Sequence, residues 1–237
     1  MSDPVRIGFI VEGPTDFVVL EAIVARLLAG REYEAISLQP TLSVALAPLN
    51  GGGWTAVYLW CRQTIELSGG TIQNNPLFDF YDIVVMQVDA DVATKRYTDD
   101  QRIVHPPDDL PFSEPCPPVS ATTDRLRRVM LGWIGESAVP PRLVLCTPSS
   151  SLETWILVGL FPADKVASKA DLECRRNIEA QLQSKPLSKR LVRSGQKDIE
   201  KYRGHAPAIA EAWTVIRSRC TEAERFSSEF SECIPRR

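Results

Sequence analysis

The stretch Ile7-Gly8-Phe9-Ile10-Val11-Glu12-Gly13-Pro14-Thr15-Asp16 predicts a buried strand that runs directly into a helix. The residues before the glutamate are mainly apolar and β-branched, as in a strand that is covered on both faces. Gly13 permits a tight turn, and Pro14 suits the first position of a helix, where its missing N–H costs nothing. Glu12 is therefore expected at the carboxyl end of a strand, where open α/β sheets bind their ligands. Asp16 follows one helical turn later.

Strands and helices alternate along the first two thirds of the chain. Further strands are expected at residues 35–42, 82–88 and 142–147, and helices at 15–28, 54–67, 124–136 and 152–160. This alternation predicts an α/β fold whose mainly parallel sheet has helices on both faces, as in Rossmann-like domains. Beyond residue 164 only helices are expected, at about 170–183, 187–193, 198–202 and 206–230.

We therefore divide the chain into an α/β domain, residues 1–164, and a helical C-terminal extension, residues 165–237. Residues 92–123 contain six prolines and show little periodicity. So long an irregular segment is unusual in a compact domain, which indicates either a functional flap or disorder. The glycine-rich loop 47–53 lacks the Lys-Ser/Thr that follows a phosphate-binding loop, so it predicts a flexible turn.

Charge is distributed unevenly along the 237 residues, whose net charge is −3. Residues 1–164 carry a balance of −9, whereas residues 165–205 contain 11 basic and 5 acidic residues. The basic part of the extension is a candidate contact for a nucleic-acid backbone. The alternative, a solvated helical face, is equally compatible with the pattern.

Composition also bears on location and on metal chemistry. Charged residues in the first twenty positions indicate no signal peptide, and prolines and glycines interrupt the uncharged stretch 35–61, so no membrane span is expected. Six scattered cysteines without a Cys-x-x-Cys motif are expected to be reduced thiols of a cytoplasmic protein. With only two histidines, a zinc site is not expected, and any metal would be bound by oxygen ligands, as Mg²⁺ or Mn²⁺ is.

Acidic residues follow three of the predicted strands. Glu12 follows the first, Asp89 and Asp91 follow the central one, and Glu153 begins the helix after the last. Strand alternation would place Asp89 and Asp91 on the same side. In a parallel sheet these ends meet at one edge, where several carboxylates repel each other unless a cation lies among them. The pattern therefore predicts a Mg²⁺ or Mn²⁺ site suited to phosphoryl transfer.

Each of these acids also has a non-functional interpretation. Glu12 could be a solvated turn residue, and Asp16 would complement the dipole of its helix in any case. Asp89 and Asp91 could cap the following turn. Ser150-Ser151-Leu152-Glu153 fits a capping box, with serine at the cap and glutamate three residues later.

The motifs Glu12-Gly13 and Asp89-Ala90-Asp91, in this order and after apolar strands, resemble the signature of the TOPRIM domain. Topoisomerases, bacterial primases, recombination-repair proteins and the overcoming-lysogenization-defect (OLD) nucleases share that domain. The resemblance covers about residues 4–160, with residues 92–123 as an insertion. Ser151-Leu152-Glu153-Thr154-Trp155-Ile156-Leu157 further resembles a helix start in small stand-alone TOPRIM-like proteins found near bacterial phage-defence loci.

The resemblance implies a Mg²⁺-dependent nuclease that cleaves phosphodiester bonds of nucleic acid in bacterial phage defence. DNA is expected before RNA as the nucleic acid, but the sequence leaves both open. It implies that Glu12, Asp89 and Asp91 bind Mg²⁺ and that Asp16 and Glu153 help to hold a second ion. A downstream lysine, Lys197 or Lys201, would steady the charged transition state. Lys197 is taken as the candidate catalytic lysine, beside Glu12, Asp89 and Asp91.

Three other functions stay open at this point. The chain could be a non-catalytic subunit that binds metal and nucleic acid or a partner defence protein. A homodimer stays open for this function and for the nuclease. It could be a phosphoacceptor or phosphatase-like domain with Asp89 as nucleophile, although the Glu12-Gly13 motif argues against this. A nucleotide-binding module is the third, and it would lack a recognisable phosphate loop.

Overall fold

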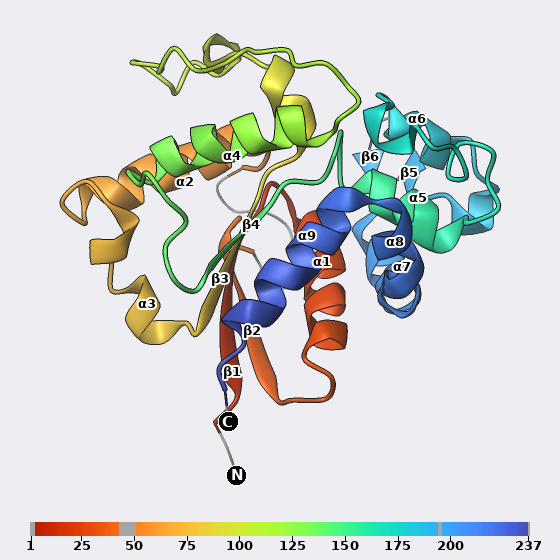
Figure 1. Cartoon of the computed structure of the whole chain (residues 1–237), viewed down its shortest axis with the longest axis horizontal. Coiled ribbons are helices and arrows are strands. Elements are labelled where there is room, and N and C mark those ends of the chain that lie inside the picture. The colour runs from red at the N-terminus through yellow and green to blue at the C-terminus, as the bar shows by residue number, and fades with distance from the viewer. Residues whose placement is uncertain (1–2, 43–50, 194–195, 237) are drawn as a thin grey trace.

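A computed structural model describes residues 3–42, 51–193 and 196–236, and its centre is a sheet of four parallel strands. The strand order is β2–β1–β3–β4 (Figure 1), so β1 and β3 are the inner strands. The strands are β1 (Val5–Ile10), β2 (Tyr33–Gln39), β3 (Ile83–Gln87) and β4 (Leu143–Cys146). Every neighbouring pair is parallel, which confirms the predicted α/β class and its parallel sheet.

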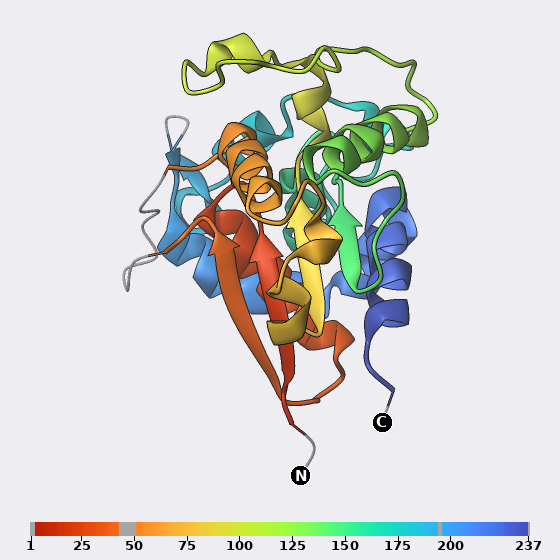
Figure 2. The same cartoon turned by 90° about the vertical axis from the view of Figure 1, so that its left-hand side faces the viewer.

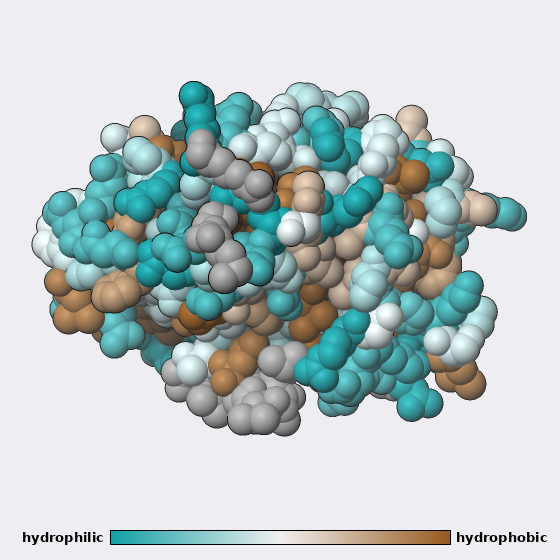
Figure 3. Space-filling view, turned by 90° about the horizontal axis from the view of Figure 1, so that it is seen from below, coloured by the Kyte–Doolittle hydropathy of each residue, from teal (hydrophilic) through white to brown (hydrophobic). Residues whose placement is uncertain are grey.

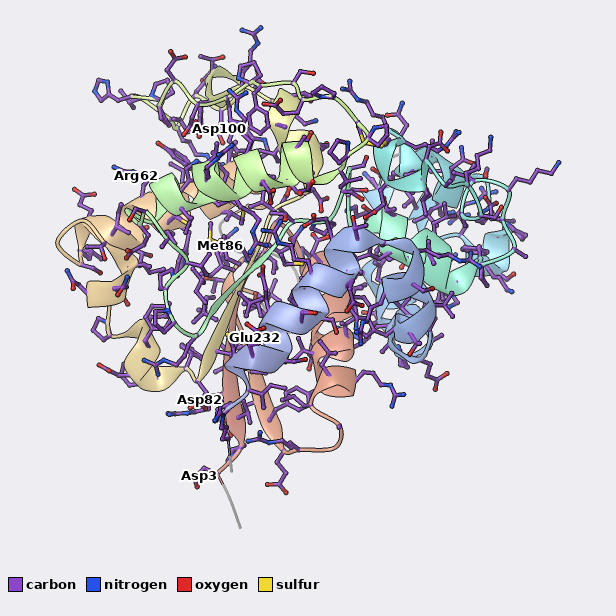
Figure 4. All side chains as sticks on the ribbon, viewed as in Figure 1. Asp3, Arg62, Asp82, Met86, Asp100 and Glu232 are labelled. Carbon is purple, nitrogen blue, oxygen red and sulfur yellow. A yellow bond between two sulfur atoms is a disulfide. The ribbon has the colours of Figure 1, made fainter. Side chains whose placement is uncertain are left out.

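Helices cover both faces of the sheet, as predicted. One face packs against α2 (Trp54–Glu66), α3 (Leu77–Phe80) and α4 (Ser120–Trp133). The core on the other face includes α1 (Pro14–Leu27), α5 (Glu153–Leu160), α6 (Ile178–Gln183), α7 (Ile199–Glu211), α8 (Trp213–Arg219) and α9 (Thr221–Cys233). The alternating side chains of β3 supply both cores: Val85 belongs to the α1 side, whereas Met86, labelled in Figure 4, lies on the side of α4.

The C-terminal extension shares the core of the sheet. Its helix α7 packs along α1, and α9 packs against the edge strand β4 (Figure 1). The extension is not entirely helical, because β5 (Val192–Arg193) and β6 (Gln196–Lys197) form an antiparallel hairpin.

Three predicted helices of the extension are wrong. Of residues 170–183, only Ile178–Gln183 (α6) is α-helical, and it follows a 3₁₀ turn at Leu172–Cys174 and a left-handed Asn177. Residues 187–193 form a short 3₁₀ turn followed by β5, with Leu191 and Val192 both buried. The ammonium group of Lys201 binds the carbonyl oxygens of Leu187 and Arg190, so these backbone groups are satisfied outside a helix. The predicted helix 206–230 is divided among α7, α8 and α9 by breaks at Ala212 and Cys220.

Residues 92–119 form a long loop over α2 and α4 (Figure 2), and α4 begins at Ser120, inside the predicted flap. The Tyr97 hydroxyl donates to Asp109 and accepts a hydrogen bond from the Trp133 indole N–H, each at 2.7 Å. Phe112 is buried as well. Aromatic contacts of this kind fix the loop on the helices beneath it.

The expectation of six reduced cysteines is wrong for two of them. Cys116 of the loop and Cys174 of the extension form a disulfide, although 58 positions separate them in the sequence. No local spacing motif predicts such a pair, because only the tertiary fold brings the two segments together. The free cysteines of the described chain are Cys61, Cys146, Cys220 and Cys233.

The ends of the described chain lie opposite the carboxyl edge of the sheet (Figures 1 and 2). Asp3 marks the beginning, and near the end the Arg31 guanidinium donates to the Pro235 carbonyl at 2.8 Å. Seen from this side, the surface is mainly hydrophilic with small, separate hydrophobic patches (Figure 3). Within the described residues, no helix is both long and apolar enough to cross a membrane.

An ion pair between a buried arginine and a partly exposed glutamate ties α9 to the rest of the fold. The Arg127 guanidinium contacts both Glu229 carboxylate oxygens at 2.7 Å and the Leu145 carbonyl at 2.8 Å. Because Arg127 is 7% exposed, its charge depends on Glu229 for compensation.

Glu229→Gln should therefore lower the free energy of unfolding by about 3 kcal/mol, since it leaves a buried guanidinium without its counter-charge. Glu224→Gln is the matched control, because Glu224 forms an exposed pair with Arg217 and should lose less than about 1 kcal/mol. Urea denaturation measures both. Equal losses in the two variants would contradict the assigned role of the Arg127–Glu229 pair.

Candidate metal centre

The carboxyl ends of the inner strands bring two of the predicted acids into contact. Glu12 follows β1, and its Oε1 accepts a hydrogen bond from the Asp89 backbone N–H, beyond the end of β3, at 2.7 Å. The Gly53 N–H donates to the Glu12 carbonyl at 2.7 Å, and a Cβ at Gly52 would lie 2.9 Å from the same oxygen. Gly52 and Gly53 therefore pack closely on Glu12, whereas residues 47–50 of the predicted turn lie outside the described chain.

A buried glutamine links the same two acids. Gln87, the last residue of β3, donates from Nε2 to Asp89 Oδ1 at 2.8 Å and accepts the Glu12 N–H at 3.2 Å. The Leu152 N–H also donates to Asp89 Oδ1, at 3.1 Å. Gln87 was not among the predicted site residues, although a polar residue at the end of an otherwise apolar strand was a usable signal.

Lys197 connects the extension to these acids. Its Nζ lies 2.7 Å from Glu153 Oε1 and 3.9 Å from Asp16 Oδ1. Tyr202 of α7 donates its hydroxyl to the same Glu153 oxygen at 2.9 Å, and this residue was not predicted as part of a site. Lys201, the other lysine considered, binds backbone carbonyls of the extension instead.

The capping-box interpretation of Glu153 is wrong. Helix α5 begins at Glu153 itself, and Ser150 adopts a left-handed backbone conformation with φ of 63° rather than the extended conformation of a cap. The Glu153 side chain is directed inward to Lys197 and Tyr202. The local sequence fitted a helix start, but the ion pair decides where the carboxylate lies.

The expectation that Asp89 and Asp91 share one side of a strand is also wrong. Strand β3 ends at Gln87, and residues 90–94 form a 3₁₀ turn, so strand alternation no longer applies. Asp89 is buried, whereas the Asp91 side chain is 49% exposed and pairs with Lys95 at 3.2 Å. Asp91 therefore lies at the rim of the acidic group.

Burial raises the pKa of three of the acids, because no positive charge fully compensates for it. Burial and the neighbouring Asp16 raise the pKa of Glu12 to about 8, and burial raises the pKa of Asp16 to about 6. Burial and the charge of Glu12 likewise hold the pKa of Asp89 well above its usual range. Burial acts in the same direction on Glu153, but Lys197 outweighs it and holds the pKa of Glu153 below its usual value.

The donor chemistry of the group suits a hard divalent cation, since every candidate ligand is a carboxylate. One buried atom, Asp16 Oδ1, has no hydrogen-bond partner among the described residues. Among the residues that the structure describes, however, no three His, Cys, Asp or Glu side chains are arranged to hold a metal ion. Lys197 is instead the cation that the structure places beside Glu153 and Asp16, so metal binding would require these side chains to rearrange.

A cleft of about 780 Å³ opens above Glu12, Asp89, Asp91 and Glu153. Of the basic residues at 165–205, the cleft is lined by Arg175, Arg176 and Lys197. Several others make internal contacts: Lys185 pairs with Asp164, Arg203 pairs with Glu200, and Arg190 and Lys201 bind carbonyl oxygens. Much of the positive charge of residues 165–205 is therefore bound by other groups of the protein and is not presented in the cleft.

Comparison with known proteins gives no relative: no protein-family model, curated protein or solved structure matches the chain significantly. The site's own geometry therefore has to carry any functional conclusion.

Lys197→Met should lower the free energy of unfolding at about pH 8 by roughly 3 kcal/mol, because it leaves Glu153 and Asp16 buried without their cation. The loss should shrink near pH 5, where the carboxylates can protonate instead. Lys201→Met is the matched control, with an expected loss of about 1 kcal/mol for its bonds to carbonyls. A loss that is the same at both pH values would contradict the electrostatic role of Lys197.

In EDTA, stability should fall as the pH rises from about 5 to 8. The pKa of Glu12 is about 8 in the folded chain and lies near its ordinary value after unfolding, so across this window the folded state holds the extra proton. Each pH unit then costs up to about 1.4 kcal/mol.

Glu12→Gln should flatten this fall, since the amide oxygen can still accept the Asp89 N–H without carrying a charge. Glu34→Gln, a change at an exposed strand residue, should leave the slope unchanged. Urea denaturation at three pH values measures the slope. If the free energy of unfolding of the wild type rose with pH instead, the raised pKa of Glu12 would be refuted.

Proposed function

We propose that this chain is a TOPRIM-type, Mg²⁺- or Mn²⁺-dependent nuclease that cleaves phosphodiester bonds of nucleic acid. The observation that carries the proposal is the grouping of carboxylates from three strand ends at the floor of a cleft, where the Lys197 ammonium pairs with Glu153. The TOPRIM-like motifs of the sequence, Glu12-Gly13 and Asp89-Ala90-Asp91, both lie at this edge.

The proposed metal ligands are the carboxylates grouped at this edge, namely Glu12, Asp16, Asp89, Asp91 and Glu153. A bound Mg²⁺ would neutralise charge on the phosphoryl oxygens of the substrate as it develops. The raised pKa values of Glu12 and Asp16 support this proposal, because buried acids that are hard to ionise gain most from a nearby cation.

The remaining roles fall to the chain's own groups. Glu12 is placed to accept a proton from an attacking water, because its carboxylate lies at the floor of the cleft beside Asp89. The Lys197 ammonium group would move from Glu153 toward the phosphate and balance the negative charge of the transition state. Tyr202 would then keep its hydrogen bond to Glu153 and hold that carboxylate in place.

The cleft bears more acidic than basic side chains, so a polyanion requires a cation to enter it. We therefore propose that nucleic-acid binding, and not only cleavage, depends on the divalent ion. Lys95 and Arg176 line the cleft and would contact the phosphates next to the scissile one. We propose DNA as the preferred substrate and phage defence as the setting. The protein could act alone, as a homodimer or with a defence partner.

A second candidate is a non-catalytic subunit that binds nucleic acid or a partner defence protein. It is favoured by one observation, that the described residues hold no ready group of three metal ligands while Lys197 pairs with Glu153. In such a subunit the lysine would be a permanent replacement for the metal ion.

Metal-dependent cleavage of plasmid, linear duplex, single-stranded DNA and RNA separates the two candidates. The wild type should cut at least one substrate with Mg²⁺ or Mn²⁺, and Glu12→Ala and Asp89→Ala/Asp91→Ala should each lower the rate by about 100-fold or more. Lys201→Met is the control, since its ammonium group binds carbonyls outside the acidic group, and it should cut normally. No cutting by the wild type, with divalent ions bound in calorimetry, would support the non-catalytic subunit.

A further inference from the structure

A fully buried glutamine stands between two of the acids at the carboxyl edge. Gln87 is the last residue of β3, and its side chain contacts both acids. Its Oε1 accepts the Glu12 backbone N–H at 3.2 Å, and its Nε2 donates to Asp89 Oδ1 at 2.8 Å. A buried amide that lost these partners would pay the cost of an unsatisfied polar group. The Gln87 amide is therefore held at both of its polar atoms.

The two contacts also decide which way the Gln87 amide faces. A backbone N–H can only donate, so the amide oxygen has to face the N–H of Glu12. The amide nitrogen then faces Asp89, whose carboxylate can accept. The reversed amide would set two donors against each other at Glu12 and two oxygens against each other at Asp89. Gln87 thus presents a donor to Asp89 in one fixed orientation.

This donor helps to occupy one particular oxygen of Asp89. The same Oδ1 accepts a second hydrogen bond, from the Leu152 N–H at 3.1 Å. A carboxylate oxygen has two lone pairs, so the two donors use the accepting capacity of Oδ1. Within the described chain, hydrogen bonds to Asp89 reach Oδ1 and not Oδ2. Because Asp89 lines the cleft, Oδ2 is the oxygen that it can offer to a ligand there.

The backbone around Asp89 is held as well. The Asp89 N–H donates to Glu12 Oε1 at 2.7 Å, and the Ala90 N–H donates to the Pro148 carbonyl at 2.9 Å. The main chain is therefore fixed on both sides of the carboxylate. The remaining freedom is rotation of the Asp89 side chain, and the Gln87 amide opposes that rotation.

We propose that Gln87 is a positioning residue that makes Asp89 a one-oxygen ligand and so favours Mg²⁺ or Mn²⁺ over Ca²⁺, an inference that rests on the metal site of the function proposed above. Ca²⁺ takes about six to eight oxygen ligands and often binds both oxygens of one carboxylate. Mg²⁺ requires octahedral geometry and keeps several waters, so a single oxygen from each carboxylate suits it. With Oδ1 occupied, Asp89 cannot supply the two-oxygen contact that would favour Ca²⁺.

Isothermal titration calorimetry tests this inference, with Mn²⁺ and Ca²⁺ as the probes. The wild type should bind Mn²⁺ about tenfold or more tightly than Ca²⁺. Gln87→Met keeps the length of the side chain and removes the donor, so Asp89 Oδ1 becomes available to an ion. The preference for Mn²⁺ should then fall to about threefold or less, because Ca²⁺ binds more tightly. A substitution that only disturbed the packing would weaken the binding of both ions alike.

Gln39→Met is the matched control. Gln39 is a buried glutamine at the end of the neighbouring strand β2, and its Nε2 has no hydrogen-bond partner among the residues that the structure describes. Its replacement should keep the preference of the wild type. Circular dichroism checks that the variants fold, and Gln87→Leu takes the place of Gln87→Met if that variant folds poorly. The wild-type ratio is a test that needs no variant.

Equal affinity of the wild type for Mn²⁺ and Ca²⁺ overturns the inference. An unchanged ratio in folded Gln87→Met or Gln87→Leu also overturns it, whether or not both ions bind more weakly. Either result leaves the proposed nuclease untouched, because cleavage is measured separately. A preference that depends on Gln87, in a wild type that cuts no nucleic acid, would refute the proposed chemistry alone. Binding of neither ion would overturn both.

Discussion

The ion pair between Lys197 and Glu153 is the interaction on which the site depends. It brings the hairpin of the extension to the first turn of α5, and through Asp16 it reaches the start of α1 as well. Without this cation, the carboxylates at the strand ends would face one another with backbone N–H groups, Gln87 and the Tyr202 hydroxyl as the described donors that oppose their repulsion. The extension is thus an electrostatic component of the acidic edge.

Under the proposed function, the same pair would give the acidic edge two states, one with Lys197 on Glu153 and one with a bound cation. With the lysine in place, the charge is balanced inside the protein, and the carboxylates are not grouped to hold an ion. A divalent cation would have to compete with an ammonium group that is already paired, so ion binding and lysine movement would be coupled. A phosphate that enters the cleft would favour the state in which the cation is bound and Lys197 has left Glu153, because the phosphate gives the displaced ammonium group a new partner.

Much of the fold could be predicted from the sequence, because it rests on local patterns. Apolar β-branched runs located the four strands within a few residues, and alternation of strands and helices gave their parallel arrangement. The topology alone was enough to predict that Glu12, Asp89 and Glu153 lie at the same edge of the sheet. What sequence patterns could not give were contacts decided by the tertiary fold. These include the orientation of Glu153, the hydroxyl of Tyr202, the end of β3 before Asp91, and the Cys116–Cys174 pair.

The position of the chain ends has a practical and an evolutionary consequence. Asp3 and Pro235 lie at the face opposite the cleft, where Arg31 fastens the end of the chain to the turn between α1 and β2. A label, a surface tether or a fused second protein attached at either end would therefore stand away from the cleft. The architecture thus leaves room for gene fusion without obstructing the acidic edge.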